Sequence, residues 1–285
     1  MSKKTGKGKK IAILLAAILV AALFGVYTAE MITEANARFI PGYEMIELME
    51  LAGMGSGDFS GEEYALLFRQ TGLGKAAVDS VFSSAEDPAS VLAAYQEKFF
   101  NPPEYTCYNI GIGTQEERFL DKKGNAVFGF EIADVRTGDI VVSKLTHSVG
   151  WRHGHAGIVI DAGKGKTFEA IYPGTLTMVQ DLSKWRTFPT YIQLRHKDPE
   201  IGEAAAAIAV EDLSGVYWRH HAGILGRSDK PGSTQCSHLI WHAFGKLGYD
   251  INSSRLWPVT PKGLVNSEHL EVVQIYGVDP ERIWK

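Results

Sequence analysis

An uncharged, apolar run near the N-terminus constrains this chain more than any other feature of its sequence. The run extends from Ile11 to Ala29, and a lysine-rich segment precedes it: Lys3, Lys4, Lys7, Lys9 and Lys10. Its length is close to the roughly 20 apolar residues that a helix needs to cross a bilayer. Lysines before such a run keep the N-terminus in the cytoplasm. We predict that residues 1–30 are a signal anchor or signal peptide, and that the protein is either a single-pass protein of the cell membrane or secreted.

The length of the run favours the anchor over the signal peptide. A signal peptide has a shorter apolar core followed by a small-x-small cleavage site. Ala35-Asn36-Ala37 fits that site but lies some distance past the run. A buried core helix is a poor third possibility, because lysines precede the run with no helix cap. Both the anchor and the signal peptide leave the rest of the chain outside the cytoplasm.

Length, charge and cysteine content exclude several classes of protein for the rest of the chain. A chain of 285 residues is long enough for one large domain or two modest ones. The formal net charge of −4 provides no basic field for phosphates, so we expect no nucleic-acid partner. Two cysteines, Cys107 and Cys236, are too few for a disulfide scaffold or a four-thiolate zinc site. They can form one bridge, or leave a reactive thiol.

Residues 31–104 form the second predicted part, a helical region that starts at about Arg38. Ser60 and Glu63 are spaced as a capping box, in which each side chain meets the other's backbone N–H. Asp87-Pro88 is typical of a helix start, and Pro102-Pro103 stops the last helix. No catalytic constellation is present here. We interpret the region as a packing or spacer module; a lid over the site, or a segment that positions substrate, is the second possibility.

Residues 105–285 form the third part, in which short strands replace long helices. Apolar, β-branched segments lie between turn residues at Ile140–Val142, His155–Ile160, Thr167–Ile171 and Tyr191–Leu194. Lys122–Asn125 is typical of a turn between two short strands, and Ala204–Val210 of a helix. This pattern predicts an α+β fold with a largely antiparallel sheet.

Cys236 is the strongest candidate for a nucleophile. It precedes apolar residues at helical spacing, Leu239, Ile240, Ala243, Phe244 and Leu247. Ser233 or Thr234 can cap the start of that helix. Cys236 then lies in the first turn, where unpaired N–H groups and the helix dipole favour the thiolate. A buried, inert cysteine is the competing interpretation.

A nucleophilic cysteine needs a base, and the chain offers nine histidines. The segments Trp151–Ile158 and Trp218–Ile224 look alike, but only the first leads into a convincing strand. A base at a strand start is held rigidly, so we favour His155. Glu169, on the expected hairpin partner strand, can fix the imidazole tautomer. The sequence does not set the hairpin register that this contact requires.

Four motifs, in this order, resemble those of a known family: Gly138-Asp139-Ile140, Gly154-His155-Ala156-Gly157-Ile158, Phe168-Glu169-Ala170 and Gln235-Cys236-Ser237-His238-Leu239. The family is the permuted papain-like cysteine hydrolases of the YiiX and YycO type, distant relatives of the NlpC cell-wall peptidases. The segment Trp257–Leu264 is also similar, and the resemblance covers roughly residues 105–275.

The resemblance implies a papain-like antiparallel sheet packed on the cysteine-bearing helix. It makes Cys236 the nucleophile, His155 the base and Glu169 its orienter, with no cofactor or metal. An extracytoplasmic thiol hydrolase follows, cleaving peptide or isopeptide amides of the cell wall through an acyl-enzyme. Relatives also include acyltransferases and lipid-directed enzymes. His238 departs from the family's small residue and is expected to narrow the cleft or shift the pKa of the thiol.

Three rival interpretations remain. His153 with His155, and His238 with His242, have spacings that suit zinc. A non-catalytic binding module for cell-wall or lipid ligands would present exposed tryptophans, of which the candidates are Trp151, Trp218, Trp241 and Trp257. A bridge between Cys107 and Cys236 would exclude the hydrolase.

Overall fold

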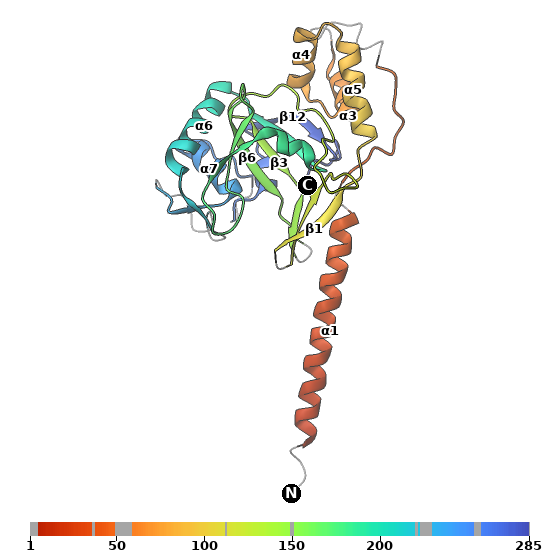
Figure 1. Ribbon diagram of the computed structural model, residues 1–285, viewed down its shortest axis with the longest axis vertical. Coiled ribbons are helices and arrows are strands. Elements are labelled where there is room, and N and C mark those ends of the chain that lie inside the picture. Colours follow the sequence, from red (N-terminus) through yellow and green to blue (C-terminus); the bar gives the residue numbers. More distant parts are fainter. Residues whose placement is uncertain are drawn as a thin grey trace.

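The chain has an α+β architecture with antiparallel sheets and one N-terminal apolar helix, seen in a computed structural model (Figure 1). The structure describes residues 5–35, 38–48, 59–111, 113–148, 151–219, 222, 230–253 and 258–284. The main sheet has six strands in the order β12-β9-β3-β6-β7-β8, and each neighbouring pair is antiparallel. Its strands are β3 (Ile140–Ser143), β6 (His155–Asp161), β7 (Lys166–Glu169), β8 (Met178–Asp181), β9 (Tyr191–His196) and β12 (Leu270–Tyr276).

Two helices cover the main sheet, α6 (Pro199–Leu213) and α7 (Cys236–Lys246), and a short helix, α8 (Pro261–Val265), contacts α7. The two long helices pack against each other and against β6 (Figure 1). On α7 the apolar residues at i, i+3 and i+4 spacing are fully buried: Leu239, Ile240, Ala243 and Phe244. The close approach of α6 to the sheet needs Gly138 (φ +94), where a Cβ would lie 2.2 Å from the carbonyl carbon of Gly202.

The start of α7 differs from the prediction in its cap. Gln235, rather than Ser233 or Thr234, is the N-cap, and its side chain accepts a hydrogen bond from the Ser237 N–H. Ser233–Thr234 instead form β11, which pairs in parallel with β10 (Tyr217–Trp218). The two hydroxyl residues are committed to that pairing, so the next residue along the chain takes the capping position.

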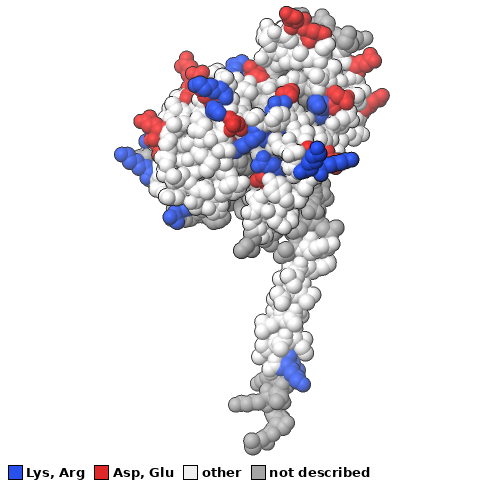
Figure 2. All heavy atoms as spheres, in the orientation of Figure 1, with Lys and Arg blue, Asp and Glu red and all other residues white. Residues whose placement is uncertain are grey.

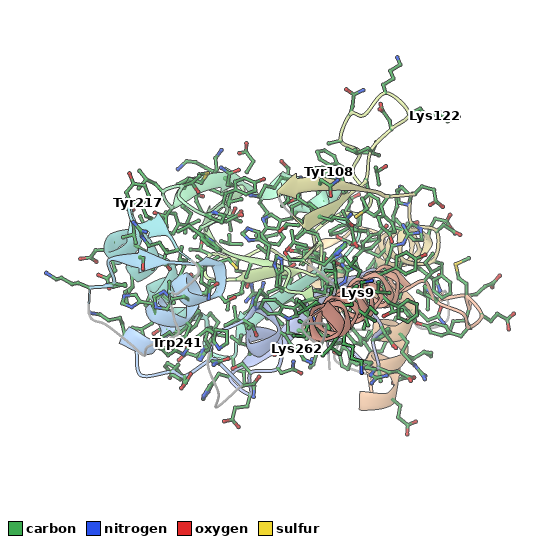
Figure 3. All side chains as sticks on the ribbon, turned by 90° about the horizontal axis from the view of Figure 1, so that it is seen from below. Lys9, Tyr108, Lys122, Tyr217, Trp241 and Lys262 are labelled. Carbon is green, nitrogen blue, oxygen red and sulfur yellow. The ribbon has the colours of Figure 1, made fainter. Side chains whose placement is uncertain are left out.

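A smaller sheet lies beside the main one, in the order β1-β2-β4-β5. Its strands are β1 (Thr106–Gly111), β2 (Thr114–Arg118), β4 (Thr146–Ser148) and β5 (Trp151–Arg152), all antiparallel to their neighbours. The predicted turn at Lys122–Asn125 is present, but it joins a single bridge between Leu120 and Ala126 instead of two strands. Lys122 lies at the tip of this loop, which stands clear of the body (Figure 3).

The helical region contains α3 (Gly61–Thr71), α4 (Lys75–Ser84) and α5 (Pro88–Phe100). The predicted capping box of Ser60 and Glu63 is present. The prediction of helix from about Arg38 is wrong for residues 38–48, which are not helical. The region packs on the edge strand β12: Gly74 N–H donates to Val273 O (2.8 Å), and Ile275 N–H donates to Gly72 O (2.7 Å). These backbone bonds fix the helices at one edge of the main sheet.

The N-terminal helix α1 (Thr5–Ala35) projects away from the body (Figure 1). None of its apolar stretch from Gly8 to Gly25 is buried, and by length and composition this stretch fits either a signal sequence or a membrane span. Figure 2 shows α1 uncharged over most of its length, while the body carries both signs of charge interspersed. The helix continues beyond the apolar run as far as Ala35. The Ala35-Asn36-Ala37 motif lies partly outside the described residues.

Candidate active site

Cys236 is held at the first position of α7 by the side chain before it. Gln235 Oε1 accepts from Ser237 N–H (2.9 Å), while Gln235 Nε2 donates to Val259 O (2.9 Å). With both ends of the amide engaged, Gln235 is fixed, and with it the start of the helix. Cys236 is half-buried in that first turn, where the helix dipole favours a thiolate.

His155 begins β6 and Glu169 ends β7, and the hairpin register brings their side chains together. Ile158 and Phe168 are register partners, so one step further Glu169 lies opposite Gly157. Because Gly157 has no side chain, the carboxyl group lies over it; a Cβ there would be 2.9 Å from Glu169 Cγ. His155 is two residues from Gly157 and points to the same face. The result is a contact of 2.6 Å between His155 Nε2 and Glu169 Oε2.

The same imidazole also reaches the cysteine. The side chains of His155 and Cys236 interact, and each shifts the pKa of the other: that of the imidazole is raised and that of the thiol is lowered. The structure thus brings together the three residues that the sequence selected, as a chain of contacts from thiol to imidazole to carboxylate.

The electrostatics of this chain of contacts favour an ion pair. Burial alone raises the pKa of the Cys236 thiol, but the hydrogen bond to His155 and the charge of the ring outweigh burial and lower it. Burial alone lowers the pKa of His155, but hydrogen bonds to Cys236 and Glu169 outweigh it and raise the pKa to about 9. Both shifts favour a thiolate beside an imidazolium.

Glu169 is completely buried and receives three further donors. Thr167 Oγ1 (2.5 Å) and Trp185 Nε1 (3.1 Å) donate to Oε1, and Lys184 Nζ (2.7 Å) shares Oε2 with His155. Burial raises the pKa of Glu169, but His155 and Lys184 together outweigh it and lower the pKa to about 2. The carboxylate therefore stays ionised and cannot rotate away from the imidazole.

Two further residues of the site, Lys184 and Trp185, were not predicted from the sequence. They lie on a 3-10 helix, η2 (Leu182–Thr187), which follows β8. The Trp185 ring stacks on the His155 ring, with centroids 5.4 Å apart and planes at 11°. No local pattern distinguishes these residues from surface and core residues, so only the tertiary structure reveals them.

The predicted influence of His238 on the cleft is wrong. Residues i and i+2 of a helix point in different directions, and His238 is buried, with Nδ1 3.0 Å from Thr234 Oγ1. Burial, followed by repulsion from His242, lowers the pKa of His238 to about 4. His238 is thus a neutral packing residue.

The zinc interpretation finds no support in the part of the chain that the structure describes, where no group of three or more ligating side chains could hold a metal ion. His153 lies between Thr146 Oγ1 (3.2 Å) and Ser148 Oγ (3.0 Å). His242 Nε2 pairs with Asp212 Oδ2 at 2.8 Å. His220 and His221 lie outside the described residues.

Cys107 and Cys236 are both free thiols, so a disulfide bridge between them is excluded. They belong to separate elements, β1 of the small sheet and α7 beside the main sheet. The thiol of Cys236 is therefore available for chemistry.

The tryptophans proposed for ligand stacking do not share one environment. Trp151 is exposed, whereas Trp241 is buried and donates to Asp250 Oδ1 (2.8 Å). Trp257 lies outside the described residues. Trp241 is therefore a core residue and cannot stack on a ligand.

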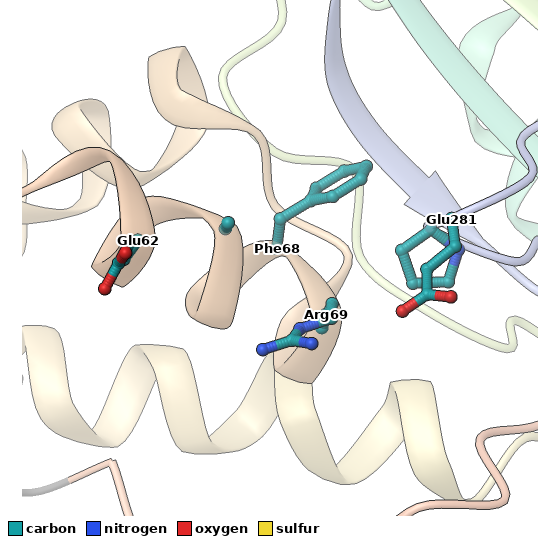
Figure 4. Close-up of a pocket in the computed structure, with 6 residues that line it drawn as sticks. Glu62, Phe68, Arg69 and Glu281 are labelled. Carbon is teal, nitrogen blue, oxygen red and sulfur yellow. The ribbon is translucent and has the colours of Figure 1, made fainter.

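An open pocket of about 420 Å³ lies between α3 and the C-terminal segment (Figure 4). None of its lining residues belongs to β6, β7 or α7; they are Glu62, Ala65, Phe68, Arg69, Pro280 and Glu281. The helical region also lies at the β12 edge, with β9 and β3 between it and β6. These positions favour the packing module over the lid.

Comparison of the chain with protein-family models, curated proteins and solved structures finds no match. The geometry of the chain itself is therefore the basis for assigning its chemistry.

Proposed function

We propose that the protein is an extracytoplasmic thiol hydrolase that cleaves an amide, a peptide or isopeptide bond of cell-wall peptides, through a cysteine acyl-enzyme. The observation that carries the proposal is one imidazole, His155, that contacts a buried carboxylate at 2.6 Å and interacts with the thiol of Cys236. This is the arrangement that nucleophilic catalysis requires: nucleophile, base and a group that orients the base.

The reaction follows from the positions of these groups. Cys236 Sγ attacks the carbonyl carbon, and the imidazolium of His155 gives its proton to the leaving amine as the C–N bond breaks. His155 then takes a proton from water, whose oxygen attacks the thioester; the acid leaves and the thiol is restored. Glu169 remains ionised and stabilises the imidazolium at each stage.

The oxyanion of each tetrahedral intermediate needs hydrogen-bond donors. The Cys236 N–H lies in the first turn of α7, where N–H groups have no acceptor within the helix. It is the donor we assign. Gln235 Nε2 is engaged by Val259 O and does not serve.

Three further features support the wider proposal. The order His155, Glu169, Cys236 along the chain, with an antiparallel sheet packed on the cysteine-bearing helix, is the one that the resemblance to the permuted papain-like hydrolases implies. The exposed apolar helix α1, used as a signal anchor, would hold the catalytic part at the outer face of the cell membrane. The absence of a strong basic field argues for an uncharged or cationic substrate over a polyanion.

A lipid ester hydrolase or acyltransferase is the second candidate, favoured by exposed apolar side chains near the site. Tyr217 and Leu176 are exposed, form a β-bridge, and Tyr217 pairs with Ser233, three residues before Cys236. Such a surface can accept an acyl chain.

The test uses the full chain in detergent micelles, incubated with peptidoglycan peptides and separately with lipid esters, with products identified by mass. Cys236→Ala and His155→Ala should each reduce kcat/KM at least on the order of 10³-fold while leaving the secondary structure intact by circular dichroism. Cys107→Ala and His153→Gln are matched controls that should retain activity. Activity retained by either site variant would refute the hydrolase, and turnover of lipid esters alone would select the second candidate.

A further inference from the structure

The small sheet carries a second thiol, imidazole and carboxylate on one of its faces. Cys107 is the register partner of Glu117, and His147 is the partner of Gln115 on one side and of Arg152 on the other. In antiparallel strands, directly opposed residues point to the same face. Strand alternation puts Gln115 and Glu117 on one face as well. Five side chains therefore lie on the same face: Cys107, Gln115, Glu117, His147 and Arg152.

The side chains of this group, which we call the Cys107 cluster, are in contact. Cys107 Sγ lies 3.6 Å from His147 Nε2 and donates to Gln115 Oε1 at 3.2 Å. The same Nε2 is 3.8 Å from Glu117 Oε1, which Arg152 holds at 2.7 Å. The imidazole nitrogen thus lies between the sulfur and the carboxylate.

The carboxylate and the imidazole of the Cys107 cluster are both buried, which makes an uncompensated charge on either of them costly. His147 and Glu117 are both 0% exposed, and within the described residues no donor reaches Glu117 Oε2. Burial, the largest influence, raises the pKa of Glu117 despite Arg152. A second cation beside the Glu117 carboxylate would reduce the free-energy cost of burying its negative charge. A proton moved from Cys107 to His147 would create such a cation.

Cys107 as a residue also keeps part of its surface exposed to solvent. Cys107 is half-buried and lies on β1, an edge strand of the small sheet. Tyr108, its neighbour on the opposite face, is exposed and lies at the outer part of the sheet (Figure 3). The cluster belongs to a different sheet from the Cys236 site and takes no part in the proposed hydrolysis.

We propose that Cys107 is a thiol–disulfide exchange site that takes a low-molecular-weight disulfide and becomes a mixed disulfide. His147 accepts the thiol proton, and Sγ attacks one sulfur of the disulfide. A new S–S bond forms on Cys107, the original S–S bond breaks, and the departing thiolate takes the proton from His147. The disulfide supplies the oxidising equivalent, so the step balances with no other reactant.

The experiment uses the full chain in detergent with Cys236→Ser, which leaves Cys107 as the single thiol, and glutathione disulfide as the probe. Intact mass measures the rate of glutathionylation at neutral pH, compared with N-acetylcysteine as a free thiol. The cluster should accelerate the reaction on the order of 10-fold, and His147→Gln should abolish the acceleration. Adding Cys107→Ser should eliminate the mass increase.

A second measurement covers the case in which His147→Gln fails to fold. In urea, the Cys236→Ser chain should react at the rate of N-acetylcysteine, because the cluster exists only in the folded state. The proposal is overturned if the folded chain reacts no faster than N-acetylcysteine, if folded His147→Gln retains the acceleration, or if the acceleration persists in urea. None of these outcomes depends on whether Cys236 is catalytic.

Discussion

Among individual residues, Glu169 is the most heavily engaged group of the Cys236 site. Its carboxylate accepts from His155, Thr167, Lys184 and Trp185. The ammonium of Lys184 and the imidazole of His155 both contact Glu169 Oε2. The positive charge of Lys184 therefore weakens the stabilisation that the Glu169 carboxylate gives to the imidazolium. Lys184 is therefore a group that tunes His155 without touching the thiol.

Lys184→Met should raise the pKa of His155 further, because it removes a positive charge next to the imidazolium. The alkaline limb of the pH profile of kcat/KM, which follows loss of the His155 proton, should then move to higher pH. Lys166→Met is the matched control, since Lys166 pairs with the exposed Asp181. An alkaline limb that stays in place, or moves to lower pH, would contradict this role.

The two shifted pKa values also predict how stability depends on pH. The pKa of His155 is raised from 6.5 to about 9, so its contribution is complete below about 6.5 and is lost as the pH rises through about 9. The pKa of Glu169 is lowered from 4.5 to about 2, so its contribution is present above about 4.5 and is lost as the pH falls through about 2.

Urea unfolding across this range measures both effects. The free energy of unfolding should be greatest near pH 4.5–6.5 as far as these two groups are concerned. Glu169→Gln should flatten the acid limb, because glutamine does not titrate, and should also reduce the alkaline loss by lowering the pKa of His155. An unchanged acid limb in this variant would show that other carboxyl groups dominate.

Among the elements, the β6–β7 hairpin can bring Glu169 to His155 because Gly157, which lies between them, has no side chain. A Cβ at Gly157 would lie 2.9 Å from Glu169 Cγ and 3.1 Å from Trp185, so both would have to move. Displacing Glu169 would uncouple it from His155. The contact between the start of β6 and the end of β7 therefore depends on the glycine at position 157.

Gly157→Ala should reduce kcat/KM on the order of 10²-fold and destabilise the fold by about 1–3 kcal/mol, as overpacking does. Gly163→Ala is the matched control: it lies in the turn after the same strand, and its nearest heavy-atom neighbour would be 3.6 Å away. Steady-state kinetics and thermal unfolding measure both effects. Equal activity in the two alanine variants would disprove the need for this glycine.

The molecule as a whole combines an exposed apolar helix with a body built around two buried hydrophobic cores. Main-sheet strands, α6 and α7 share one core, while α3–α5 have a second core that joins β12 through Val273. The helical region therefore braces the sheet edge, and the Cys236 site lies toward the other half of the sheet. We infer that α1 acts as a tether and the helical region as a support.

If α1 is an anchor, the mature protein retains it. A chain tagged at its N-terminus should keep the tag, remain in the membrane fraction after alkaline carbonate, and need detergent for release. Leu19→Arg should weaken membrane insertion by about 2.5–3.5 kcal/mol, whereas Ile40→Arg, an exposed position outside the apolar run, should have no effect. Loss of the tag from a secreted product would identify a signal peptide instead.

Features that depend on neighbours along the chain could be predicted from the amino-acid sequence. The apolar periodicity of α7, the β6 and β7 segments, the capping box and the apolar stretch of α1 are local patterns, and each element forms where its pattern occurs. His155, Glu169 and Cys236 could also be selected as candidates in their chain order. Local spacing along the chain does not define strand register, so the sequence does not predict the contact between His155 and Glu169.

Which distant groups meet depends on the packing of the folded chain. Strand register places the Glu169 carboxyl over Gly157, and a 3-10 helix brings Lys184 and Trp185 to the same carboxylate. His238 on α7 is buried beside Thr234. The small sheet likewise brings Cys107 beside His147, which lie on strands far apart in the chain. Helices and strands arise from short-range periodicity, whereas a site requires the packing of whole elements, because only packing sets the distances between side chains that the sequence keeps apart.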